Sequence, residues 1–145
     1  MEFTLKKSYT IVFDFLRKHY LKTYVDELGG ILSDMQIVGE WGTADPAAWG
    51  DWIKVVKNQN GYKLLHEKCK ECSHKWCKYE CDIHDIFTVT SEDAYTAMID
   101  LLKYHNMCTQ DKELNEYITE LELSKCNLSA DLYKKWVQHL EEYCK

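Results

Sequence analysis

Proline and glycine are scarce in this chain of 145 residues, which contains one Pro and six Gly. Few positions therefore interrupt regular secondary structure, and long helices are expected. No apolar run approaches the ~20 residues that a membrane-spanning helix needs. The amino terminus lacks the charged segment, apolar stretch and small-residue cleavage site of a secretory signal. We therefore expect a cytoplasmic protein without a membrane segment.

Catalytic motifs are also missing. The sequence has no Gly-rich phosphate loop, no nucleophile elbow and no His-Glu-x-x-His pattern. Carboxylate pairs such as Glu113 with Glu116 are close neighbours on one helix, where such pairs mostly face solvent. Because no set of nucleophile, base and oxyanion donors is recognisable, we expect no enzymatic activity.

Clustered positive charge is absent as well, and the net charge is −6. Residues 1–57 carry seven basic and eight acidic side chains, residues 58–88 carry five of each, and residues 89–145 carry six basic and eleven acidic. Direct binding to a nucleic-acid backbone needs clustered Lys and Arg and is therefore disfavoured. The acidic surface suits a basic protein partner, or serves only to keep the protein soluble.

Hydrophobic residues make up 46% of the chain and aromatic residues 13%, which is enough for a buried core. Apolar residues recur at helical spacing in three segments of the first half. The first begins after a Thr4 cap, the second runs from about Asp26 to Gln36, and the third begins at Asp45 and Pro46. The expected inner faces are Leu5, Tyr9, Val12, Phe13 and Leu16 in the first helix, and Trp49, Trp52, Ile53 and Val56 in the third.

Three further helices are expected in the second half. They begin at a capping box of Thr90 and Asp93, after Asp111, and after a Ser129 cap. The expected inner faces are Tyr95, Met98, Ile99 and Leu102, then Leu114, Tyr117, Ile118 and Leu121, then Tyr133, Trp136, Val137 and Leu140.

The two halves share an order of residues. Ser8, Tyr9, Thr10 and Asp14 recur as Ala94, Tyr95, Thr96 and Asp100, Met35 recurs as Leu121, and Trp52 recurs as Trp136 after a two-residue slip. This favours duplication, although any two amphipathic helical segments fall into partial register. We predict an all-α fold, a compact bundle of two related three-helix units at residues 4–57 and 90–145. A connector at 58–89 joins them within a single domain, 1–145.

The connector is rich in potential metal ligands: His66, Cys69, Cys72, His74, Cys77, Cys81 and His84. Four thiolates at Cys69, Cys72, Cys77 and Cys81 would suit zinc, although the loop between the two pairs is short for a zinc module. The alternative is a helix in which cysteines serve as small apolar residues, and a regulatory thiol is a third reading. A short strand near Ile86 to Val89 is also open, because β-branched and aromatic residues cluster there.

Residues 26–36 (DELGGILSDMQ), followed by 44–52 (ADPAAWGDW) and preceded by 13–20 (FDFLRKHY), carry a family resemblance. This pattern resembles small bacterial immunity proteins of contact-dependent growth inhibition and related polymorphic toxin systems. The resemblance covers about residues 5–57, with a divergent second copy at about 91–143. The second copy lacks the Gly pair, the Asp-Pro pair and the first tryptophan, and the Cys/His segment has no counterpart in that family.

The resemblance implies a helical, non-catalytic, cytoplasmic inhibitor, a monomer or weak dimer that binds the carboxy-terminal domain of a cognate toxin. We expect it to occlude the toxin's active site or substrate groove. If the toxin is a nuclease, its basic groove would attract acidic residues. The expected contacts form the densest acidic cluster: Asp111, Glu113, Glu116, Glu120 and Glu122. The family motif residues, expected to be structural, are Asp34, Met35, Asp45, Pro46, Trp49 and Trp52. The competing hypothesis is a zinc-stabilised cytoplasmic interaction or regulatory module centred on the Cys/His segment.

Overall fold

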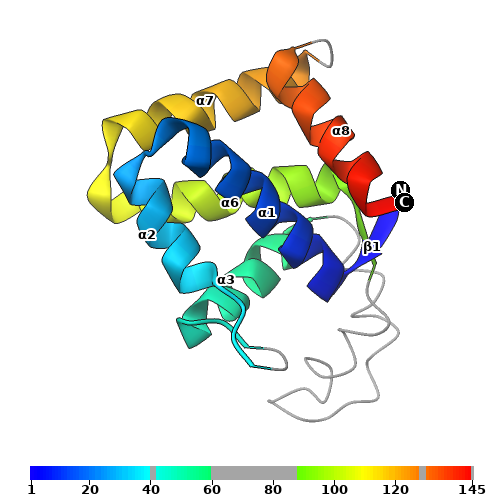
Figure 1. Ribbon diagram of the computed structural model, residues 1–145, viewed down its shortest axis with the longest axis horizontal. Coiled ribbons are helices and arrows are strands. Elements are labelled where there is room, and N and C mark those ends of the chain that lie inside the picture. The colour runs from blue at the N-terminus through cyan, green and yellow to red at the C-terminus, as the bar shows by residue number, and fades with distance from the viewer. Residues whose placement is uncertain (40–41, 60–87, 128–129, 145) are drawn as a thin grey trace.

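The computed structural model describes residues 1–39, 42–59, 88–127 and 130–144 (Figure 1). In chain order the elements are β1 (Glu2–Thr4), α1 (Leu5–Thr23), α2 (Asp26–Met35), α3 (Pro46–Lys57), β2 (Thr88–Thr90), α6 (Ser91–Thr109), α7 (Lys112–Cys126) and α8 (Asp131–Cys144). The predicted all-α fold is confirmed, with six helices in these ranges and a two-stranded sheet as the exception. Of the helices described, none has the length and apolar character to cross a membrane.

Side-chain caps determine where four of the helices begin. Thr4, Asp45, Thr90 and Asp111 each accept a hydrogen bond from a backbone N–H in the following turn, at distances between 2.9 and 3.2 Å. These caps satisfy N–H groups that have no partner inside the helix. Caps at Thr4, Asp45 and Thr90 were predicted from sequence, and a helix was predicted after Asp111, whereas the predicted Ser129 cap lies outside the described residues.

Equivalent tyrosines link the first two helices of each half. The Tyr9 hydroxyl of α1 donates to the Met35 carbonyl at the end of α2, at 2.6 Å. The Tyr95 hydroxyl of α6 donates to the Leu121 carbonyl of α7, at 2.9 Å. Both donors and both acceptors are offset by 86 positions, from Tyr9 to Tyr95 and from Met35 to Leu121. Burial raises the pKa of both phenols, so both remain protonated donors.

Removing either hydroxyl tests whether the two bonds are equivalent. We expect Tyr9→Phe and Tyr95→Phe each to lower the free energy of unfolding by about 1 to 2 kcal/mol, because a buried carbonyl loses its donor. Urea unfolding measures the change. Tyr104→Phe is the control, since Tyr104 is 52% exposed and should lose less than about 0.5 kcal/mol. If neither Tyr9→Phe nor Tyr95→Phe changed the free energy of unfolding, the two buried hydrogen bonds would be contradicted.

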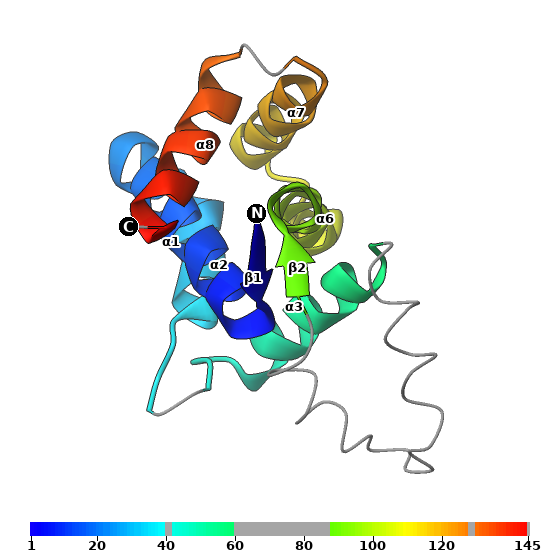
Figure 2. The same cartoon turned by 90° about the vertical axis from the view of Figure 1, so that its right-hand side faces the viewer.

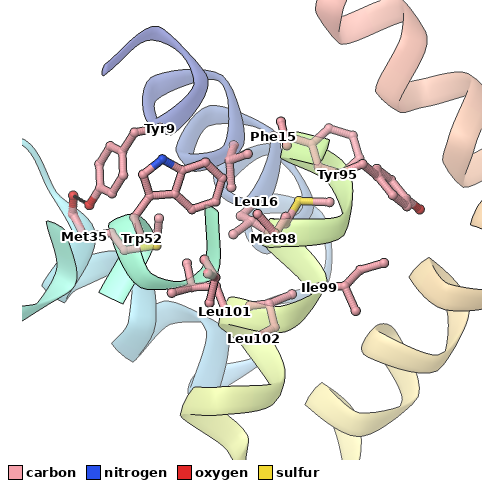
Figure 3. Packing of buried hydrophobic residues seen from close by; sticks show 14 of the residues in the cluster. Tyr9, Phe15, Leu16, Met35, Trp52, Tyr95, Met98, Ile99, Leu101 and Leu102 are labelled. Carbon is pink, nitrogen blue, oxygen red and sulfur yellow. Dashed lines mark hydrogen bonds between the residues drawn. The ribbon is translucent and has the colours of Figure 1, made fainter. Parts of the chain in front are cut away.

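The two tryptophans also occupy equivalent places. Trp52 of α3 and Trp136 of α8 are fully buried. Trp52 meets the Tyr9 ring edge-on with ring centroids 6.1 Å apart, and Trp136 meets the Tyr95 ring with centroids 5.5 Å apart. Figure 3 shows Trp52 beside Tyr9 and Met35 in the core. The two aromatic clusters therefore stand at matching points of the two halves.

The short sheet joins the two halves at their starting points. β1 pairs antiparallel with β2, and Phe3 lies opposite Val89 at the centre of the register. These two residues are again 86 positions apart and both are buried. The strand pairing therefore follows a local two-fold symmetry between the halves. Figure 2 shows the strands side by side where α1 and α6 begin. The sequence pattern indicated β2 as one alternative, whereas β1 was not expected.

The third helix of each half packs on the first helix of the other half. α3 contacts α6, and α8 contacts α1. Hydrogen bonds close both contacts at equivalent positions: Gln59 Nε2 donates to Asp100 at 3.2 Å, and the Tyr143 hydroxyl donates to Asp14. Asp14 and Asp100 recur in the sequence, and each holds the end of a helix from the opposite half.

The observed core differs from the predicted one, in part because each third helix packs on the opposite half. Ile11 and Phe15 of α1 are buried although they lie outside the predicted stripe, because α8 covers a second side of α1. Phe13 and Trp49 are only partly buried, at the rim of the core. Val137 is 39% exposed, so its predicted burial is wrong. The buried side of α8 is formed instead by Trp136, His139 and Leu140.

Candidate functional site

α7 carries the predicted toxin contacts, and the structure separates them into different settings. The predicted residues are Asp111, Glu113, Glu116, Glu120 and Glu122. Glu113, Glu116 and Glu120 are exposed at helical spacings of three and four, so they share one side of α7. None of these three glutamates forms an ion pair with another described residue. We call them the α7 acidic face.

The other two predicted contacts have partners inside the protein. Glu122 forms an ion pair with Lys103 of α6, with 2.5 Å between Oε1 and Nζ. Asp111 caps α7 by accepting from the Leu114 N–H at 2.9 Å. Its own backbone N–H donates to the side chain of Asn106, at 2.8 Å. Glu122 and Asp111 therefore help to position α7 and are less available to a partner than the α7 acidic face.

A shallow, open depression borders the α7 acidic face. It has a volume of about 680 Å³ and is lined by Gln110, Lys112, Asn115, Glu116, Thr119 and Glu120. All six lining residues carry polar groups, and Leu123 lies further along the helix with 66% of its surface exposed. The surface therefore offers carboxylates, amide groups, the Lys112 ammonium group, the Thr119 hydroxyl and one apolar side chain to a partner.

The family motif residues have structural positions. Met35 and Trp52 are buried, and the Met35 carbonyl accepts from Tyr9. Asp45 caps α3, Pro46 is its first residue, and the Asp34 carbonyl accepts from the Asp45 N–H at 3.0 Å. Trp49 packs edge-on against the Tyr9 ring, with centroids 5.4 Å apart. This motif therefore joins α1, α2 and α3.

One glycine of the predicted pair permits close packing. A Cβ atom at Gly29 would lie 2.8 Å from the Tyr20 ring, which is too close, whereas Gly30 has open space. In the second half Asn115 occupies the position equivalent to Gly29, and Asn106 that of Tyr20. There the Asn106 side-chain amide donates to the Asn115 carbonyl oxygen at 2.7 Å. The equivalent pair of positions in the second half is therefore joined by a polar bond.

The metal prediction falls outside the described residues. Cys69, Cys72, Cys77 and Cys81 all lie in residues 60–87. Within the described ranges, no group of three or more His, Cys, Asp or Glu side chains is arranged to hold a metal ion. Zinc at the four cysteines remains a prediction.

A basic pocket that was not expected from sequence lies between α1 and α8. Its volume is about 190 Å³, with Phe15 and Leu132 as apolar walls. Lys18, His19 and Lys22 line it from α1, and Lys135, Gln138, His139 and Glu142 line it from α8. Three ammonium groups therefore face one carboxylate, although the whole chain is acidic.

Two neutral histidines lie in the pocket wall. His19 stacks on the Tyr117 ring with centroids 3.7 Å apart. Burial, together with repulsion from Lys135 and Lys22, lowers the pKa of His19 to about 4. Burial also lowers the pKa of His139, and its neutral ring donates from Nε2 to the Ile11 carbonyl at 2.8 Å.

The lysines differ in their partners. Lys18 donates to Glu142 at 2.7 Å and lies 3.2 Å from Nδ1 of His139. Lys22 and Lys135 form no ion pair with any residue that the structure describes. The sequence carried a weak signal: Lys18 with Lys22, and Lys135 with His139, are spaced to share a helix face. Only the packing of α8 on α1 brings the two pairs together.

The α7 acidic face and the basic pocket have opposite charge and lie on different helices. The resemblance to immunity proteins depends mainly on residues of α2 and α3, which belong to neither surface. Its segment 13–20 in α1 includes Phe15, Lys18 and His19 of the basic pocket. No family model, curated protein or solved structure matches the chain.

Proposed function

We propose that this protein binds and neutralises a basic toxin domain, covering the toxin's active site or substrate groove with the α7 acidic face. The observation that carries the proposal is the exposure of Glu113, Glu116 and Glu120 without internal cationic partners. Like charges at such spacings destabilise a helix by about 0.2 to 0.5 kcal/mol per pair. Cationic side chains of a partner would relieve this repulsion.

The mechanism requires no chemistry on the inhibitor. Carboxylates fixed on a rigid helix attract a basic groove over several ångströms and speed encounter. Once docked, the helix occupies space that a phosphate backbone would otherwise fill. The packing of α7 against α6 and α8 holds the acidic face in place before binding, which reduces the entropy lost on association.

The direct test is a titration against the carboxy-terminal domain of the large secreted protein encoded immediately upstream of the gene. We expect one-to-one binding with Kd on the order of nanomolar, and protection of the toxin's substrate. A folded toxin domain that shows no binding would overturn the proposal.

The contribution of the acidic face is tested by Glu113→Gln with Glu120→Gln in one double variant. We expect the toxin affinity at low salt to fall by about tenfold or more, mainly through slower association, and its salt dependence to weaken. Surface plasmon resonance at several salt concentrations measures both rates.

The chain offers a matched control. Glu27 and Asp34 occupy the equivalent positions on α2, 86 residues earlier, so Glu27→Gln with Asp34→Asn removes the same charge at matching places. This control should leave the affinity within about twofold. Equal losses in the two double variants would mean that overall charge, and not the α7 face, attracts the toxin.

A further inference from the structure

We infer that the pocket between α1 and α8 binds a small organic anion, with the anionic group held between Lys22 and Lys135 and an apolar or aromatic body against Phe15 and Leu132. The inference does not depend on toxin neutralisation, because the pocket and the α7 acidic face share no residue. A phosphate monoester and a carboxylate both have the required chemistry.

The size of the pocket suits a substituted ring. A cavity of about 150 Å³ in another protein accommodates benzene, and this pocket measures about 190 Å³. Its walls combine Phe15 and Leu132 with positive charge at the opening. Small-molecule sites commonly pair such apolar walls with a few polar groups that fix the orientation of the ligand.

Two of the three lysines that line the pocket have no acidic partner among the described residues. Glu142 neutralises Lys18, whereas Lys22 and Lys135 have no carboxylate partner among the described residues. Lys22, Lys135 and His19 all line the pocket. An anion there would interact favourably with both ammonium groups.

The second half of the molecule provides an internal comparison. At the equivalent positions of α6 and α3, Tyr104 replaces Lys18, Cys108 replaces Lys22 and Asp51 replaces Lys135. The histidine is retained, and His105 Nε2 lies 3.9 Å from Asp51. Because α3 packs on α6 as α8 packs on α1, while the residues at the equivalent positions differ in charge, the positive pocket is not a necessary result of the fold.

The test is calorimetric titration of the full chain with phenyl phosphate, benzoate and inorganic phosphate at low ionic strength. We expect phenyl phosphate or benzoate to bind with Kd below about 1 mM, and the tighter of the two identifies the head group. Inorganic phosphate should bind at least about fivefold more weakly than phenyl phosphate, because it lacks the apolar body. No binding of either aromatic anion at about 10 mM would overturn the inference. Equal affinity for both phosphates would overturn the assigned role of Phe15 and Leu132.

Neighbouring lysines of α8 provide matched variants. Lys135→Asp introduces the residue found at the equivalent position of α3 and should weaken binding by about tenfold or more. Lys134→Asp makes the same charge change one residue away, outside the pocket lining, and should change the affinity by less than about threefold. Equal losses would show diffuse attraction and overturn the site.

NMR titration of His19 gives an independent readout. A bound anion favours the protonated imidazole, so saturating phenyl phosphate should raise the His19 pKa from its value of about 4. Calorimetric binding without a change at His19 would locate the ligand elsewhere.

Discussion

Replacing Trp136 by alanine is expected to lower the free energy of unfolding by about 3 to 5 kcal/mol. Trp136 is fully buried, and its ring meets Phe15 of α1 with centroids 5.2 Å apart and Tyr95 of α6 with centroids 5.5 Å apart. One substitution therefore removes packing both within the second half and between the halves. Because ordinary domains are stable by only about 5 to 15 kcal/mol, such a loss would leave little reserve.

Urea unfolding followed by far-ultraviolet circular dichroism measures this loss, since the tryptophan signal itself changes. Val137→Ala is the control on the next residue of α8. Val137 is 39% exposed, so its replacement should cost less than about 1 kcal/mol. If Val137→Ala were as costly as Trp136→Ala, Val137 would belong to the buried side of α8, as periodicity predicted, and the structure would be contradicted.

Separating the halves is expected to unfold both. A fragment of residues 1–59 retains α1, α2 and α3 but loses α6, against which α3 packs, and α8, which covers α1. The apolar groups on those surfaces would return to water, at about 25 cal/mol per Å². A chain of about 60 residues has little core to compensate. We therefore expect each fragment alone to lose most of its helical signal and cooperative unfolding.

Mixing residues 1–59 with residues 60–145 should restore both properties, because the contacts between halves need no covalent link. Circular dichroism, with sedimentation to identify a one-to-one complex, measures the recovery. The control is the second fragment with Leu101→Asp, which places a charge at a buried position of α6 and should prevent recovery. A folded monomer of residues 1–59 with the stability of the whole chain would contradict this account.

The helix starts were predictable because they depend on residues close together in the sequence. Thr4, Asp45, Thr90 and Asp111 are helix caps because of a side chain acting on the next turn, which sequence spacing reveals. β1 spans only Glu2–Thr4, too short for a periodic pattern, and it depends on β2 for pairing.

Contacts between the halves were beyond sequence reasoning. The recurrence of Asp14 and Asp100 was visible, but their partners, Tyr143 and Gln59, belong to the opposite half and are different residue types. The basic pocket also depends on packing between the halves, because its lysines come from α1 and α8, at the two ends of the chain. Of the predicted acidic contacts, periodicity grouped Glu113 with Glu116, but it did not show that Lys103 pairs with Glu122.

The packing of each third helix on the opposite half affects how well the fold tolerates substitutions of surface residues. The framework is held by buried groups, such as Trp52 and Trp136, and by bonds to Asp14 and Asp100. Lys135 and Asp51 stand outside that framework, at matching places with opposite charge. The molecule therefore carries two differently charged versions of one helix pairing on the same framework. A substitution at either position is expected to change the surface charge while the fold is kept.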